Sequence, residues 1–284
     1  MNIFTKRNLK LFFRDRSAVF FSLLAILIII VLYAVFLGDV WLPDAMEGVN
    51  GVDTLMDSWL VAGLLAVASV TTTMGAFGIM IDDRVKKADR DFYASPFPRS
   101  RLMAGYLGSA FWIGTIMSII TFAAAEVYIV LRGGSLLEPF LCMKIFLLIF
   151  LSTIANTSAV CFIVSFFRSQ HAFSTASTII GTVIGFLAGI YLPIGSLPSS
   201  VQTVVKLFPV SYSASLFRSI LMTGPMEISF DGAPAQILSD FKIYMGVTYY
   251  FGDYEISPFA SILILAGTAV IFFCLSLFNL SKKR

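Results

Sequence analysis

Long stretches without a charged residue dominate the pattern of apolar and polar positions along this chain. A bilayer core about 30 Å thick requires roughly 20 apolar residues in a helix. Since lipid offers no partners to open backbone groups, each stretch of that length is expected to cross as a helix. The pattern predicts an all-α integral membrane protein with six transmembrane helices, one in each of these stretches: between Arg16 and Asp39, between Asp57 and Asp82, from Leu102 past Glu126 to Leu131, between Lys144 and Arg168, from about Ala172 to Leu192, and between Glu255 and Lys282.

Prolines end the fifth of these predicted helices. The uncharged run that holds it continues to Lys206, which is too long for a single crossing. Pro193 and Pro198 interrupt the run, and proline cannot donate a hydrogen bond inside a helix. We therefore expect a helical hairpin in the outer leaflet between spans five and six, within an extracellular segment covering 192–257. Residues 1–284 then form a single transmembrane domain.

Lysine and arginine are unevenly distributed among the segments that connect the spans. With both termini in the cytoplasm, the inside segments carry 15 of the 20 basic residues and 5 of the 17 acidic ones. The inside charge is then +10 and the outside charge −7, which together give the net +3 of the chain. Since basic residues concentrate on the cytoplasmic side of membrane proteins, this topology is favoured, and it places these segments inside: 1–16, 82–101, 168–171 and 281–284.

Composition agrees with the membrane interpretation. Apolar residues make up 58% of the chain and charged residues only 13%, and the mean hydropathy is +0.88. A soluble protein of this size could not bury so much apolar surface. Soluble enzymes, nucleic-acid-binding domains and disulfide scaffolds are therefore excluded. The cysteines lie in or beside spans, and we interpret them as small packing residues: Cys142, Cys161 and Cys274.

The first segment, 1–16, has the pattern of an amphipathic helix. At helical spacing its basic residues fall within one arc and its phenylalanines and leucines lie opposite. Such a helix is expected in the cytoplasmic interface, with its basic face toward anionic lipid headgroups. The alternative is a basic flank without helical structure. The basic residues of the arc are Lys6, Arg7, Lys10 and Arg14.

Residues 82–101 are the most polar segment of the chain. Ten of the 20 residues are charged, and both signs are present. Mixed charges in so short a segment favour a helix that lies on the cytoplasmic surface, and Ser95 and Pro96 would end it before the next span. Phe92 and Tyr93 could anchor it or dock into a partner. The alternative is a solvated loop that only sets topology.

The sequence shows no catalytic or metal-binding pattern. The dipeptide Gly-Lys never occurs, so a P-loop for nucleotide phosphates is excluded. The single histidine, His171, lies at a predicted cytoplasmic helix start. Ion-coupled transport requires charged groups at mid-membrane depth, whereas Glu126 and Lys144 both lie near the outer ends of their spans. An ion-coupled secondary transporter and a membrane-embedded enzyme therefore remain weaker alternatives.

Small residues form stripes on two of the predicted spans. On span five, Gly181, Gly185 and Gly189 repeat every four residues, which is the spacing of closely approaching membrane helices. Span two is rich in small and hydroxylated residues. Either stripe could pack within the chain, form a homodimer interface or line a translocation path. The hydroxylated candidates are Ser69, Thr72 and Thr73.

In layout, the whole chain resembles the type-2 permeases of ATP-binding-cassette exporters. It shares a basic first helix, six spans, a charged loop after span two and a proline-broken outer hairpin. Two departures from that family are Lys87, where glycine is frequent, and Arg90, where an acid is frequent. The local motifs that carry the resemblance are Asp83-Arg84, then Phe92 and Ser95-Pro96, and further on Leu197-Pro198, Phe208 to Tyr212 and Arg218.

The resemblance implies that two copies, or this chain and a similar one, form a pore in a bacterial inner membrane. Two separate ATPase subunits would bind Mg-ATP, and this chain would hold no cofactor and bind no nucleic acid. The implied ATPase-coupling residues are Asp82, Asp83, Arg84, Lys86, Lys87, Asp89, Arg90, Phe92 and Tyr93. The implied outer gate is Phe208, Pro209, Tyr212 and Arg218, and the path would run between spans two and five.

The scarcity of charge within the membrane favours an apolar or amphipathic cargo, such as a drug, an antibiotic or a lipophilic peptide. A glycan or glycolipid is the alternative cargo for the same class of exporter.

Overall fold

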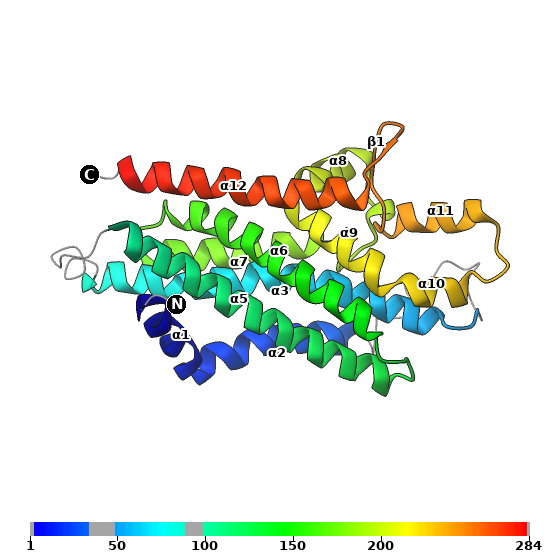
Figure 1. Cartoon of the computed structure of the whole chain (residues 1–284), viewed down its shortest axis with the longest axis horizontal. Coiled ribbons are helices and arrows are strands. Elements are labelled where there is room, and N and C mark those ends of the chain that lie inside the picture. Colours follow the sequence, from blue (N-terminus) through cyan, green and yellow to red (C-terminus); the bar gives the residue numbers. More distant parts are fainter. Residues whose placement is uncertain (1–2, 34–48, 89–98, 283–284) are drawn as a thin grey trace.

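The computed structural model describes residues 3–33, 49–88 and 99–282, and these residues are mostly helical. The long helices run side by side along one axis (Figure 1). Their bounds are α1 Ile3–Arg14, α2 Arg16–Leu32, α3 Val52–Val85, α5 Arg99–Leu131, α6 Pro139–Val164, α7 Gln170–Leu187, η3 Ile194–Ser196, α8 Ser199–Leu207, α9 Pro209–Leu221, α10 Thr223–Ser229, α11 Ala235–Tyr244 and α12 Pro258–Lys282, with a two-stranded antiparallel pair, β1 Tyr250–Phe251 and β2 Tyr254–Glu255, before the last helix.

Four helices are long and apolar enough to cross a membrane, namely α3, α5, α6 and α12. Helices α1 and α2 meet at a bend of 70° and meet the same criteria as a pair, so the described residues hold at most five such spans. Helix α7 has 18 residues, and serine, threonine, glutamine and histidine fill much of its first half. The prediction of a helical membrane protein is confirmed, and the count of six spans stays a prediction.

Helix α3 is the central helix of the bundle. It has 34 residues, which corresponds to roughly 51 Å. It is apolar around most of its circumference, as expected for a helix enclosed by others. Helices α5, α6, α7 and α9 all pack against it, and Leu55, Trp59, Leu65 and Ile81 are fully buried. The positions of α5, α6 and α7 are therefore set by contact with α3, whereas α12 packs on α6 and α9.

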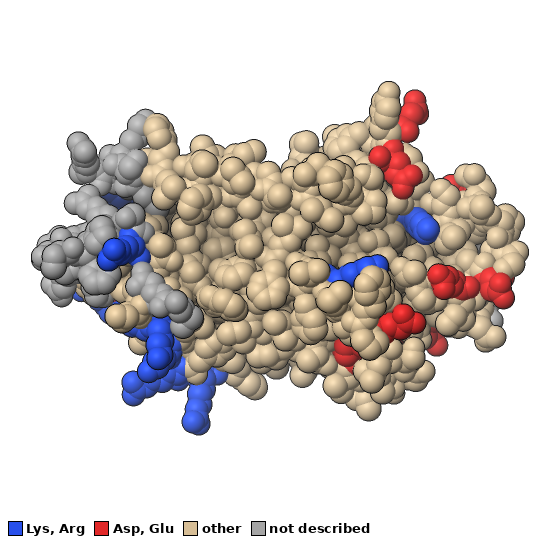
Figure 2. All heavy atoms as spheres, in the orientation of Figure 1, with Lys and Arg blue, Asp and Glu red and all other residues tan. Residues whose placement is uncertain are grey.

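Charged residues gather at the two ends of the long axis. Most lysine and arginine side chains lie at one end, which we call the basic end, and the aspartate and glutamate side chains in view lie toward the other, the acidic end (Figure 2). A broad band with few charges separates them. The basic end holds α1 and the carboxyl ends of α3 and α12 (Figure 1). This separation matches the charge distribution read from the sequence.

The fifth predicted span is shorter than expected, because α7 ends at Leu187 and not at Leu192. Gly189 follows with φ +65°, a conformation that glycine adopts without steric cost. The Ile190 amide donates to the Gly185 carbonyl at 3.0 Å, and the Gly189 amide donates at 3.0 Å to the carbonyl three residues earlier. These are the two bonds of a Schellman helix end. The prediction that Gly189 belongs to a glycine stripe on a helix surface is therefore wrong.

Arg218 holds the outer hairpin against the end of α7. Its Nη2 donates to the carbonyl oxygens of Ala188 at 2.7 Å and Gly189 at 2.9 Å, and its Nη1 donates to that of Gly246 at 3.4 Å. The guanidinium carbon lies 5.0 Å from the centre of the Trp59 ring on α3. Only 1% of Arg218 is exposed. Carbonyls that a helix end leaves without partners thus stabilise a buried cation.

We expect the substitution Arg218→Met to destabilise the protein, because it leaves buried carbonyl oxygens at the end of α7 without donors. Hydrogen bonds from a charged donor contribute about 1.5–3 kcal/mol each, so we expect a loss of roughly 3 kcal/mol. For a chain of this size that corresponds to a thermal midpoint lower by roughly 6 °C. Thermal unfolding of the purified protein in detergent measures it.

Arg16→Met is the matched control, because Arg16 is exposed at the start of α2. If both variants unfold at the wild-type midpoint, Arg218 does not hold the hairpin.

Candidate functional site

A network of charged and polar side chains joins α1 to α3 at the basic end. Arg7 on α1 makes a two-fold ion pair with Asp83, in which each guanidinium nitrogen lies 2.9 Å from a carboxylate oxygen. The Tyr106 hydroxyl on α5 donates to the same carboxylate at 2.7 Å. The hydrogen bonds to Asp83 raise the pKa of Arg7 above its ordinary value. Because paired donors fit a carboxylate in one orientation, this contact fixes α1 relative to α3.

Helix α1 packs closely on α5, because the Phe4 side chain lies against the backbone at Gly105. A side chain at Gly105 would collide with the Phe4 ring, and Phe4 meets the Tyr106 ring edge-on with 4.9 Å between centroids. The Asn8 amide also donates to Ser109 at 3.2 Å. Asn8 is fully buried, so α1 has one face inside the protein. The helix predicted for 1–16 is present, and its polar residues take part in packing as well as in solvation.

Arg84 connects α3 to the turn between α6 and α7. Its Nη1 donates to the carbonyl oxygen of Phe167 at 3.0 Å. Asp83 is only 6% exposed. Two residues that the family resemblance assigns to ATPase coupling, Asp83 and Arg84, thus contact this chain itself. Their arrangement links the end of α3 to α1 on one side and to the α6–α7 turn on the other.

The predicted surface helix does not begin at Asp82, because α3 continues to Val85. The residues that face outward here are Val85, Lys86 and Lys87. Lys87 has φ +59°, a left-handed conformation that glycine adopts more easily. The lysine at this position therefore occupies the conformation of a helix end. The other predicted coupling residues lie outside the described residues: Asp89, Arg90, Phe92 and Tyr93.

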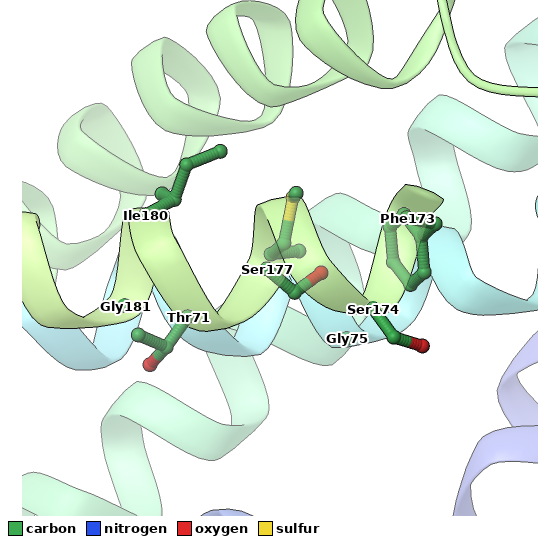
Figure 3. A pocket seen from close by; sticks show the side chains of 8 residues that line it. Thr71, Gly75, Phe173, Ser174, Ser177, Ile180 and Gly181 are labelled. Atoms are coloured by element: carbon green, nitrogen blue, oxygen red, sulfur yellow. The ribbon is translucent and has the colours of Figure 1, made fainter. Parts of the chain in front are cut away.

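The C-terminal half of α3 borders an open groove. On one side, a cavity of about 310 Å³ separates α3 from α7, and Thr71, Gly75, Ser174 and Ser177 line it (Figure 3). On the other side, a cavity of about 510 Å³ lies between α3 and the α1–α2 pair. Both share Thr71 and Gly75. We call these two adjoining cavities together the α3 groove. It reaches Asp82 and Lys86 at the basic end.

The hydroxylated residues predicted for a path or dimer interface are mostly turned into the protein. Ser69, Thr72 and Thr73 are at most 2% exposed, and each donates to a carbonyl of its own helix. Ser69 also accepts from the Asn156 amide at 2.7 Å. Only Thr72 reaches the edge of the α3 groove. The composition of the sequence identified this helix as small and hydroxylated. Only the structure shows which of its residues face the groove, and these are Thr71 and Gly75.

The three glycines of span five have separate environments. A side chain at Gly181 would meet no atom within 4 Å, and this residue lines the α3 groove. A side chain at Gly185 would collide with the Tyr191 ring, so this glycine permits the chain to fold back after α7. Gly189 forms the helix end described above. Equal spacing in sequence therefore does not correspond to one surface.

The residues predicted as an outer gate are divided between the interior and an apolar surface pocket. Tyr212 is 3% exposed, and its hydroxyl donates to the carbonyl oxygen of Lys206 at 2.6 Å. Arg218 is also buried, as described above. Phe208 and Pro209 line an apolar pocket of about 280 Å³ together with residues of α3, α6, α7 and α12. Their role as a gate stays a prediction.

A second polar cavity, of about 650 Å³, lies at the acidic end between α3, α5, α6 and α10, and we call it the acidic-end cavity. Glu126 and Lys144 both line it. The Leu137 amide donates to Glu126 Oε2 at 3.0 Å, and the Lys144 ammonium lies 4.5 Å from the centre of the Phe140 ring. The structure therefore gives these two predicted charges a common location. Within the described residues, no group of three metal-binding side chains comes together.

Comparison with known proteins agrees with this architecture. The family model described as "ABC-2 type transporter" matches residues 1–222. "Nodulation protein J" from Rhizobium leguminosarum bv. trifolii is 26% identical over 174 residues, which is 60% of this chain and 63% of that protein. The alignment thus spans less than two thirds of this relative's length.

We expect a charge swap to test the contact between α1 and α3. Arg7→Asp places two carboxylates together, and Asp83→Arg does the same with two guanidinium groups, so each should lower the thermal midpoint. The double variant recreates an opposite pair and should recover at least about 1 kcal/mol, a typical coupling for neighbouring residues. Thermal unfolding in detergent of all four proteins measures the coupling.

Lys10→Glu is the control, because Lys10 is exposed on the same helix and should combine additively with Asp83→Arg. Additive losses in the swapped pair as well would show that the contact does not stabilise the protein.

Proposed function

This chain belongs to the ABC-2 type transporter family, and we propose that it is the permease subunit of an ATP-driven exporter. It is a multi-pass membrane protein with several apolar helices. The observation that carries the proposal is the α3 groove, because it is open, contains small and hydroxylated residues, and leads to the ion-paired basic end. A separate ATPase subunit would supply the energy from Mg-ATP, since this sequence has no P-loop.

In this proposal the basic end faces the cytoplasm. The separation of basic from acidic residues along the long axis supports this orientation. Helices α2 and α7 would complete a set of six spans with α3, α5, α6 and α12. An even number of spans places both termini on the same side, in agreement with the basic residues near both ends of the chain.

We infer that the α3 groove is half of the cytoplasmic part of a translocation path, completed by a second copy or a similar chain. Elsewhere α3 is enclosed by its neighbours, and in this half it is exposed at Gly75. On its α7 side, the groove is lined by Thr71, Ser174 and Ser177, together with Phe173, Ile180 and Met74. An apolar lining with scattered hydroxyl groups suits an amphipathic cargo, which can bury its apolar part and keep a few hydrogen bonds.

Energy coupling would pass through the contacts of α3 at the basic end. A partner that pushes on the exposed end at Val85 to Lys87 also acts on α1 through Asp83 and on the α6–α7 turn through Arg84. The same push would therefore move three elements as one unit. A transporter of this kind alternates between two states only if the partner binds them differently, and an exposed, charged helix end can provide such a difference.

A glycan is the second candidate cargo. The hydroxylated residues on the α7 side of the groove, Thr71, Ser174 and Ser177, favour it, because sugar hydroxyls exchange hydrogen bonds with serine and threonine.

We expect an ATPase subunit to co-purify with this chain when the two are expressed together in membranes. The double substitution Lys86→Glu and Lys87→Glu should weaken that association at least tenfold, because it reverses two exposed charges at the proposed docking surface. Pull-down at fixed detergent and salt concentration, followed by ATPase assay, measures it.

Lys242→Glu at the acidic end is the control, and it should leave ATPase binding unchanged. Failure to capture any ATPase with the wild-type chain would contradict the proposed function.

A cysteine at Gly75 should react with a charged, membrane-impermeant maleimide, if the α3 groove is open to water. The test uses a variant whose three native cysteines are replaced by alanine, in inside-out vesicles. Gly267→Cys on α12 is the matched control, since both glycines have open space around them. Gly267 should stay unlabelled, because lipid and not water would cover it. Equal labelling of both positions would argue against a water-filled groove.

A further inference from the structure

The acidic-end cavity carries separated charges of both signs. Glu126 is 9% exposed, and only its Oε2 has a hydrogen-bond partner among the described residues, the Leu137 amide. Its second oxygen, Oε1, accepts no hydrogen bond from the part of the chain that the structure describes, and the residue lines the cavity. Lys144 lies on the opposite helix, α6, and forms no ion pair within 4.0 Å of a described carboxylate. A ligand with one cation and one anion would satisfy both groups.

Both groups lie within reach of lipid headgroups. Glu126 is five residues before the end of α5 at Leu131, and Lys144 is five residues after the start of α6 at Pro139. At 1.5 Å per residue each is roughly 7.5 Å inside its helix end. Helix α6 has 26 residues, or roughly 39 Å, and therefore extends about 9 Å beyond a 30 Å hydrocarbon core. Shared equally between the two ends, this excess places Lys144 roughly 3 Å inside the hydrocarbon boundary, and Glu126 lies at the same distance from its own helix end. Long charged side chains at this depth can extend to the polar headgroups.

An apolar ridge on α6 flanks Lys144 on both sides, with Phe140 toward the start of the helix and Leu147 toward its middle. Phe140, Met143 and Leu147 are 60%, 52% and 63% exposed. With Lys144 they occupy positions three and four residues apart, which lie on one face of a helix. A molecule whose charged group contacts Lys144 can therefore lay an acyl chain along the same face. A soluble zwitterion would not use this ridge.

We propose that the acidic-end cavity binds a zwitterionic aminophospholipid, with its ammonium group at Glu126 and its phosphate at Lys144. The charges of the cavity exclude anionic lipids, because Glu126, Glu138 and Glu227 face it with Lys144 as the single base among its lining residues. A primary ammonium is preferred over choline, since it can donate an N–H hydrogen bond to Oε1 of Glu126 and a quaternary ammonium cannot. The volume of about 650 Å³ accommodates a headgroup.

The test measures lipid binding to the purified full chain in detergent by lipid-dependent thermal stabilisation. The probes are dioleoyl phosphatidylethanolamine, its N-methyl and N,N-dimethyl forms, phosphatidylcholine and phosphatidylglycerol, all with the same acyl chains. We expect apparent affinity to fall stepwise as N–H donors are replaced by methyl groups. Ethanolamine should bind roughly tenfold tighter than choline, the effect of one charge-assisted hydrogen bond. Phosphatidylglycerol should bind weakest.

Two variants test which side chain contacts the ammonium and which contacts the phosphate. Glu126→Gln keeps an acceptor for the Leu137 amide and loses the charge, so it should abolish the preference for ethanolamine over choline. Lys144→Gln should weaken the binding of both lipids by a similar factor. Glu255→Gln and Lys242→Gln are the matched controls, because both lie outside the cavity and should leave the lipid series unchanged.

Glycerophosphoethanolamine, which has the headgroup without acyl chains, separates a lipid from a soluble zwitterion. Weak binding of this compound together with tight binding of the lipid supports the proposal, and equal affinities overturn it. Equal stabilisation by all headgroups, strongest binding of phosphatidylglycerol, or a retained ethanolamine preference in Glu126→Gln would also overturn it. The wild-type headgroup series decides the question even if a variant fails to fold. None of these measurements depends on export or on an ATPase.

Discussion

The packing of four helices around α3 is the constraint on which the rest of this structure depends. A bilayer provides no hydrophobic drive between helices, so their association relies on close packing and on polar contacts. Along most of α3 this packing is complete, and its first half has Trp59 and Leu55 fully buried. Where the enclosure opens, at Thr71 and Gly75, a groove forms. The enclosed half thus fixes the architecture, and the open half borders the groove.

Polar contacts complete the packing at both ends of this helix, and they do so with opposite chemistry. At the basic end, a carboxylate on α3 accepts hydrogen bonds from a guanidinium on α1 and from a tyrosine hydroxyl on α5. Toward the other end, the buried guanidinium of Arg218 takes backbone carbonyls as its partners, together with the Trp59 ring. In each case the buried charge is satisfied by groups from two or more elements, so the contact specifies how those elements are arranged.

The location of four spans, α3, α5, α6 and α12, could be predicted from the sequence, because charge is excluded from the hydrocarbon core regardless of tertiary structure. The direction in which a residue faces could not. Ser69, Thr72 and Thr73 share a helix with Thr71, and only the neighbours of α3 decide that the first three turn mostly inward. Likewise, the spacing of Gly181, Gly185 and Gly189 predicted one surface, whereas the helix ends before Gly189. Asp83 and Arg84 look like exposed loop residues in sequence, since their partners on α1 and after α6 are far away along the chain.

The left-handed conformation of Lys87 has a consequence for how the chain leaves the membrane. A residue with a β-carbon is held in this region only by its surroundings, and Lys87 adopts it directly after the last turn of α3. The direction from α3 to Ala88 is thus set by the two backbone torsions of Lys87, next to two side chains that are bonded to α1 and to the α6–α7 turn. Because Asp83 and Arg84 hold the end of α3 in place, a rotation at Lys87 would reorient Ala88 without moving the helix before it.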